Sequence, residues 1–171
     1  MATALKAERK YLAHYVDAAF DLTGKATEYV RLGEDLTELN VELNPNIETS
    51  ANILGDNSVA HSGYEASADA SPVYYKYDDA LTEKLMEIAM MRKSGDACRT
   101  TYVEVLLKPG TTDDDPPTVT RAVREDVLLI PTSYGGDTSG VQVPFTLNFT
   151  GNRVKGNFDL TNKTFTPDTA L

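Results

Sequence analysis

The stretch "VQVPFTLNFT", residues 141–150, alternates apolar and polar side chains at every position. A period of two is typical of a β-strand with one buried face, and here the other face is polar but uncharged. Because proline cannot donate a hydrogen bond to a neighbouring strand, Pro144 predicts a bulge or a sheet edge, where another chain can add. The candidates for an inter-subunit strand are therefore the positions on this second face: Gln142, Pro144, Thr146 and Asn148.

The residues that follow, "TGNRVKGNFDL" from 150 to 160, predict a second strand. Gly151 and Asn152 form a dipeptide typical of tight turns, and Val154, Phe158 and Leu160 then supply an inward face. We expect the two strands to pair as a hairpin.

An acidic segment lies upstream. In "DLTELNVELN", residues 35–44, Leu39 and Val41 alternate with Glu38 and Glu42, so the pattern predicts a strand with an acidic face. From residue 32 to residue 75 the chain has eight acidic residues and no Lys or Arg. Such a face is often only a solubility device, but ordinary solvated faces mix both signs of charge. The missing cations favour a surface that keeps anions away.

The remaining elements complete a chain that is mainly β with one α-helix. A helix is predicted over 79–93, with Asp79 as its N-cap and an apolar stripe that includes Leu85 and Ile88. Residues 45–63 are too many and too polar for a tight turn and predict a long loop, which in a compact domain usually has a function. A length of 171 residues suits a single domain over 1–171. Further strands are predicted at 12–17, 27–32, 64–70, 99–107 and 119–130.

Composition argues against several classes of function. A net charge of −10 disfavours nucleic-acid or membrane binding by this chain, since both use clustered Lys and Arg. Cys98, His14 and His61 are too few for a structural zinc site, and Pro116 and Pro117 interrupt the only aspartate run. The N-terminus predicts neither a signal peptide nor a spanning helix. With no nucleophile, phosphate-loop or dinucleotide motif, we expect no enzyme, no cofactor and no metal.

The order of these parts resembles the tail tube proteins, or major tail proteins, of long-tailed bacteriophages. The pieces that carry the resemblance are "YVRLGEDLTELNVELNPNIETSANILG", residues 29–55, and "FTGNRVKGNFDLTNKTFTP", residues 149–167. The resemblance implies a β-sandwich of two packed sheets flanked by the helix, with the inner sheet contributing to a β-barrel between subunits. It also implies hexameric rings that stack into a tube for genome delivery.

The same resemblance implies roles for particular segments. The N-terminal arm, 1–10, and the 45–63 loop would contact other subunits, the loop reaching the neighbouring ring. Candidates in that loop are Asn46, Ile47, Ile53, Leu54 and Asp56. The acidic lumen of the family is matched here by Glu38, Glu42 and Glu48.

Partners and location follow from the resemblance as well. The chain would bind copies of itself and the tape measure, tail tip and tail terminator proteins, and double-stranded DNA would pass through the lumen without specific binding. The protein would be made in the cytoplasm of the host bacterium and end in the virion tail.

Two other functions stay open from the sequence. The chain could form the tube of a contractile tail, a phage-like bacteriocin or a secretion apparatus, which a neighbouring sheath gene would indicate. It could instead be a monomeric β-sandwich that binds a ligand or partner, in which case it would remain a monomer at every concentration.

Overall fold

The computed structural model describes residues 4–23 and 27–169, so the predicted N-terminal arm lies partly outside the described residues. Within these described residues, two 3-10 turns, one α-helix and twelve strands follow one another. They are η1 (Arg9–Tyr11), β1 (Leu12–Asp17), β2 (Tyr29–Arg31), β3 (Val41–Glu42), β4 (Pro45–Ala51), β5 (Asn57–Tyr64), β6 (Ser67–Ala70), α1 (Ala80–Met91), η2 (Gly95–Cys98), β7 (Arg99–Lys108), β8 (Thr118–Pro131), β9 (Gly135–Asp137), β10 (Gly140–Gln142), β11 (Phe145–Asp159) and β12 (Thr164–Pro167).

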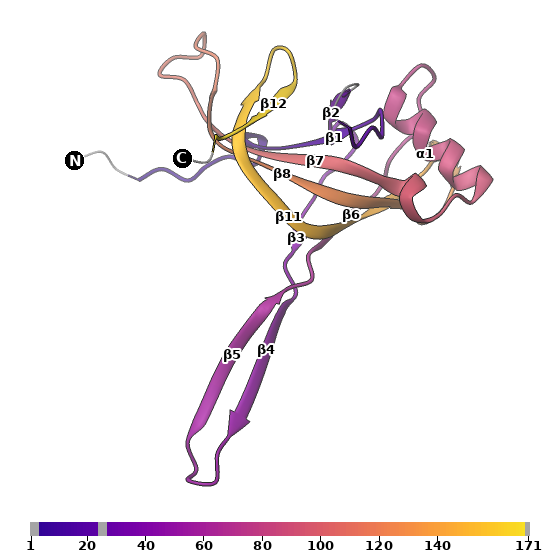
Figure 1. The fold of residues 1–171 in the computed structure, drawn as a ribbon. Helices are drawn as coiled ribbons and strands as arrows, with labels where there is room; N and C mark the ends of the chain where they lie inside the picture. The colour runs from indigo at the N-terminus through magenta and orange to yellow at the C-terminus, as the bar shows by residue number, and fades with distance from the viewer. Residues whose placement is uncertain (1–3, 24–26, 170–171) are drawn as a thin grey trace.

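Over the described part of the chain the fold is mainly β with a single α-helix, as predicted, and its strand pairs are antiparallel. The main sheet has eight strands in the order β2-β1-β7-β8-β11-β6-β3, with β12 paired to β11. The eight strands form one continuous, strongly curved sheet, and α1 lies across one end of it (Figure 1). Two small two-stranded sheets, β9 with β10 and β4 with β5, stand apart from it.

The helix forms where its sequence signals place it. The carboxylate of Asp79 accepts a hydrogen bond from the backbone N–H of Thr82 at 2.9 Å, which satisfies one of the free donors of the first turn. Leu81, Leu85 and Ile88 are buried, so the predicted apolar stripe faces the sheet. The helix ends at Arg92, whose left-handed backbone conformation closes the last turn.

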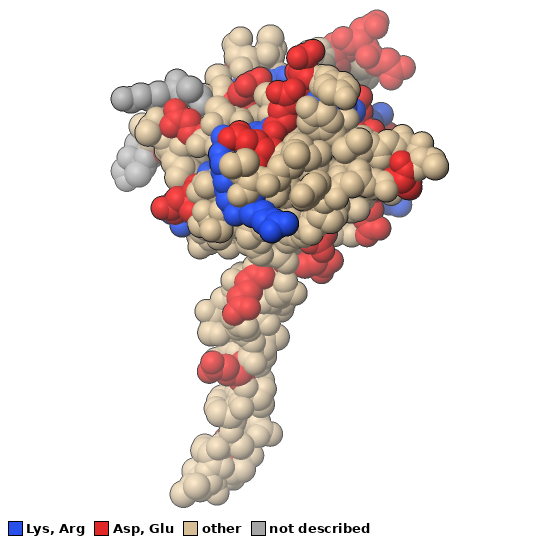
Figure 2. All heavy atoms as spheres, turned by 90° about the vertical axis from the view of Figure 1, so that its right-hand side faces the viewer, with Lys and Arg blue, Asp and Glu red and all other residues tan. Residues whose placement is uncertain are grey.

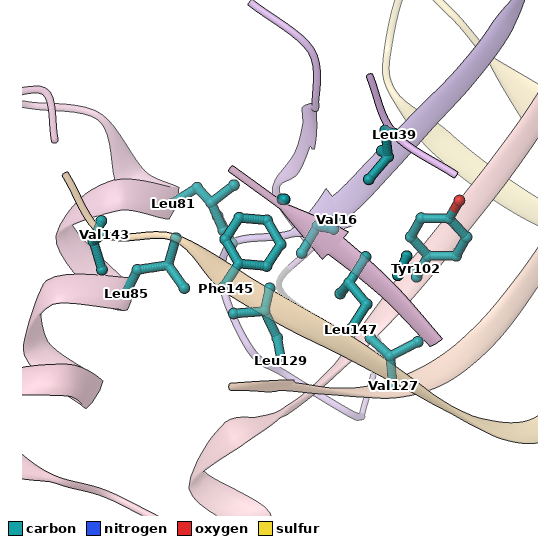
Figure 3. Packing of buried hydrophobic residues seen from close by; sticks show 13 residues of the cluster. Val16, Leu39, Leu81, Leu85, Tyr102, Val127, Leu129, Val143, Phe145 and Leu147 are labelled. Atoms are coloured by element: carbon teal, nitrogen blue, oxygen red, sulfur yellow. The ribbon is translucent and has the colours of Figure 1, made fainter. Parts of the chain in front are cut away.

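Both faces of the main sheet are buried over its central strands. On the first face, Leu85 of α1 packs with Leu129 of β8 and with Phe145 and Leu147 of β11 (Figure 3). On the second face, the ring of Phe158 contacts those of Tyr15 and Tyr29, with centroids 4.5 Å and 5.8 Å apart. Because β1 and the first half of β7 are covered on both sides, their buried residues run almost without interruption.

The prediction of a C-terminal hairpin over 141–160 is wrong. Residues 145–159 form one long strand, β11, which pairs with β8 on both sides of a register shift between Phe149 and Arg153. Gly151 has a positive φ of 86° and its N–H donates to the Glu125 carboxylate at 2.7 Å, so the Gly-Asn pair makes a bulge and no turn. The chain bends there but keeps the same partner strand.

Candidate interaction surface

The segment 45–63, predicted as a loop, is an ordered β-hairpin that projects from the body of the molecule (Figure 1). Strands β4 and β5 pair from Pro45 with Tyr64 to Ala51 with Asn57. The turn between them is held by Asn52, whose side-chain oxygen accepts the backbone N–H groups of Leu54 and Asp56 at 2.9 and 3.0 Å. The prediction of a loop is therefore wrong. Strands without a buried face need no alternation of apolar and polar residues, so the sequence pattern did not reveal these two strands.

The hairpin has two different faces and an apolar tip. Residues opposite one another in an antiparallel pair point the same way, so Ile47 and Val59 lie on one face and Glu48 lies on the other. At the tip, Ile53 is fully exposed and Leu54 is 81% exposed. Figure 2 shows separate acidic patches along the hairpin and no Lys or Arg, which agrees with the lack of cations over residues 32–75.

A lone two-stranded hairpin in water is only marginally stable. Nearly every residue of β4 and β5 is exposed, and among the strands of the described residues these two pair only with each other. At the base, Asn44 and Glu65, which flank the two strands, are joined to each other by hydrogen bonds of 3.1 and 3.2 Å. An exposed hairpin with aliphatic side chains at its end is the arrangement expected of a segment that docks on another surface.

The strand with an acidic face predicted within residues 35–44 is largely wrong, and the three acidic candidates do not share one strand face. Only Val41 and Glu42 are paired, as β3, while Leu39 turns into the core. Glu38 lies in the preceding connection, where Asn40 donates to its carboxylate, and lines a hollow of about 450 Å³. Glu42 and Glu48 are exposed, on β3 and on the hairpin.

The candidates for an edge strand are also corrected. Thr146 and Asn148 lie in β11, which is hydrogen-bonded to β8 on one side and to β6 on the other, so this part of the strand is inside the sheet. Gln142 pairs with Gly135 and bridges to Tyr74. Pro144 sits between β10 and β11, and its carbonyl accepts the N–H of Thr132 at 3.0 Å. The proline marks a break in the ladder, as a bulge would, and exposes no edge for another chain.

A buried polar cluster around His14 was missed by sequence reasoning. His14 is 3% exposed; its Nδ1 is hydrogen-bonded to the hydroxyl of Tyr102, and its Nε2 lies 2.9 Å from an Nη of Arg9. Because a guanidinium can only donate, Nε2 accepts and Nδ1 carries the proton. The same Arg9 nitrogen donates to the carbonyl of Leu39 at 2.9 Å, so the cluster joins η1, β1, β7 and the 32–40 connection.

Burial dominates the electrostatics of this cluster. Burial, helped by the charges of Arg9 and Arg31, lowers the pKa of His14 to about 4, so the imidazole is neutral near pH 7. Burial also raises the pKa of the Tyr102 hydroxyl. The thiol of Cys98 is buried and donates to the carbonyl of Lys93 at 3.4 Å, and burial raises its pKa too. Groups that are held neutral and enclosed suit a structural role better than nucleophilic chemistry.

Over residues 4–23 and 27–169, no cluster of three or more His, Cys, Asp or Glu side chains is arranged to hold a metal ion. Within the same residues, no helix is long and apolar enough to cross a membrane. The exposed hairpin therefore remains the surface that most needs a functional explanation.

No protein-family model matches the chain, and no curated protein matches it either.

Proposed function

We infer that this chain is a structural subunit of a phage tail tube, assembling into hexameric rings that stack into a conduit for the genome. The observation that carries the proposal is the β4–β5 hairpin, which extends from the body with exposed aliphatic side chains and has no partner within the described chain. The order of sequence parts that resembles tail tube proteins supports the same proposal.

The geometry of the hairpin favours repeated assembly. A projecting tip that docks on a different surface of an identical copy makes a heterologous contact. Such contacts close into rings or continue as filaments, depending on the rotation between copies. In the proposed tube, the hairpin supplies one such contact between copies, and a second contact between copies is needed for rings to stack.

The charge distribution suits a DNA conduit. Lys and Arg lining such a channel would hold the phosphate backbone non-specifically at many points along its path. The chain has a net charge of −10, and the 32–75 segment that contains the hairpin has no cation. In the proposed tube, Glu42 and Glu48 belong to the surface that repels DNA, and Glu38 is a weaker candidate because it lines a hollow in the subunit. The tape measure, tail tip and tail terminator proteins complete the proposed set of partners.

Electron microscopy of the concentrated, purified chain tests this function. The proposal predicts hollow tubes of constant diameter with a regular axial repeat. A homogeneous monomer at every concentration, or only irregular aggregates, would contradict it.

A further inference from the structure

The first face of the main sheet changes character along its length. Its apolar end is covered by α1, and its other end continues beyond the helix. Residues in register across neighbouring antiparallel strands point to the same face. Three successive rows cross β7, β8 and β11 on this face: Tyr102, Glu125 and Arg153 in the first, Glu104, Val123 and Lys155 in the second, and Leu106 and Arg121 in the third.

Side chains from all three rows line a groove with cationic walls. The hollow has a volume of about 520 Å³ and is lined by Thr120, Arg121, Val123, Arg153 and Lys155. Leu106, beside Arg121 in the register, is 37% exposed and adds aliphatic surface. The groove thus combines aliphatic side chains with positive charge, in a chain whose net charge is strongly negative.

The cations of the groove are not equally engaged. Arg153 lies 3.2 Å from the buried carboxylate of Glu125 and 3.7 Å from that of Glu104, so it is held by its own subunit. Oε2 of Glu125, the oxygen in that ion pair, accepts no hydrogen bond of good geometry, so the contact with Arg153 is electrostatic. In the described part of the chain, Arg121 and Lys155 form no ion pair. Their charges are therefore available to an outside partner.

The tip of the hairpin carries complementary groups. Ile53 and Leu54 are exposed aliphatic residues. The carboxylate of Asp56, close by in the turn, accepts a hydrogen bond from the side-chain amide of Asn52 at 3.1 Å. No Lys or Arg occurs within the surrounding 32–75 segment. Aliphatic contact flanked by opposite charge is the pattern of an interface whose apolar centre supplies affinity and whose rim charges supply register.

We propose that the groove lined by Arg121, Val123 and Lys155 receives the hairpin tip, residues 52–56, of a second copy of this chain. The subunit's own tip points away from the body, so the contact joins two molecules (Figure 1). Ile53 and Leu54 lie against Val123 and Leu106, and Asp56 pairs with Arg121 or Lys155. The inference rests on the proposed self-assembly and adds the receptor surface to it. Glu48, on the arm of the hairpin, stays outside the groove.

Charge reversal tests the contact. Arg121→Glu with Lys155→Glu, and separately Asp56→Lys, should each raise the protein concentration needed for tube formation by at least about tenfold, because each brings like charges together. All three changes in one chain should restore assembly to near the wild-type concentration. Lys84→Glu, on α1 at the covered end of the face, is the matched control and should assemble normally. Circular dichroism of each variant at a concentration too low for assembly checks that its subunit is folded.

The outcomes separate the two levels of the proposal. If wild-type protein forms no tubes, the proposed function fails and this contact fails with it. If the wild type forms tubes and the folded Arg121→Glu, Lys155→Glu variant does so equally well, the groove is not the receptor and the tube remains. Rescue by the triple variant supports the contact, and no rescue contradicts it. If a 30-base-pair DNA duplex binds the wild type but not the groove variant, the groove is a nucleic-acid site and the docking proposal is overturned.

Discussion

A chain carrying Ile53→Asp and Leu54→Asp should remain monomeric at concentrations where the wild type assembles. Each of these side chains would lose about 1.5–3 kcal/mol of favourable burial at the interface. Because 1.4 kcal/mol changes an association constant tenfold, the pair should weaken each contact by roughly 10²- to 10⁴-fold. Both residues are exposed in the subunit, so its own stability should change little. Sedimentation velocity over a range of concentrations measures the effect.

The control is a second pair of neighbouring exposed apolar residues. Met90 and Met91, at the end of α1, are 61% and 69% exposed, and Met90→Asp with Met91→Asp adds the same charge elsewhere. This variant should assemble like the wild type. Equal loss of assembly in both variants would mean that added charge alone is responsible, and the hairpin tip would have no special role.

Mild acid should destabilise the subunit through His14. The imidazole binds a proton with a pKa near 6.5 in the unfolded chain but only near 4 in the fold, because burial and Arg9 disfavour its charged form. Between these values the unfolded state binds more protons, so stability is complete above about pH 6.5 and falls as the pH drops toward 4. The difference corresponds to about 3 kcal/mol. Glu104 on β7 is the acidic residue in register with His14 across the strand pair.

Urea unfolding of the dilute monomer at pH 7, 6 and 5 measures this effect. His14→Gln keeps polar atoms in the cluster but cannot titrate, so its stability should depend less on pH over this range than that of the wild type. His61→Gln, at the exposed histidine of the hairpin, is the control and should behave like the wild type. If the wild type and His14→Gln show the same pH dependence, the cluster is not the source of acid sensitivity.

The elements predicted well from sequence are those whose local pattern reports burial. The strand predicted over 119–130 matches β8 (Thr118–Pro131) closely. The reason is that buried residues alternate with less buried ones over much of this strand. The helix prediction rests on Asp79 and on the spacing of Leu85 and Ile88, and these residues act as expected. Such signals are local, so a single sequence contains them.

Glycine-containing bends were harder to interpret. A Gly-Asn pair suits both a hairpin turn and a bulge, because both need a positive φ. What decides the outcome at Gly151 is the length of β8, which offers ladder partners on both sides of the bend, and the Glu125 carboxylate that binds the bulged N–H. Neither can be inferred from residues 141–160 alone.

The surfaces proposed for assembly were the least accessible to sequence reasoning. The hairpin strands have no buried face and so no strong periodic signal. The groove joins Leu106, Arg121 and Lys155 through strand register, which brings together residues far apart in the chain. The lack of cations over 32–75 did point to the segment that contains the hairpin, but not to its conformation.

Hydrogen exchange of the wild-type amides, before and after assembly, tests most directly whether the hairpin is the contact between copies. In the dilute monomer, amides at the tip, including Ile53 and Leu54, should exchange fast because an unpacked hairpin opens readily. In assembled material the same amides should become protected by at least about tenfold, since opening then requires undocking. If tubes form while the hairpin amides exchange as they do in the monomer, the copies are joined through another surface and the central claim is wrong.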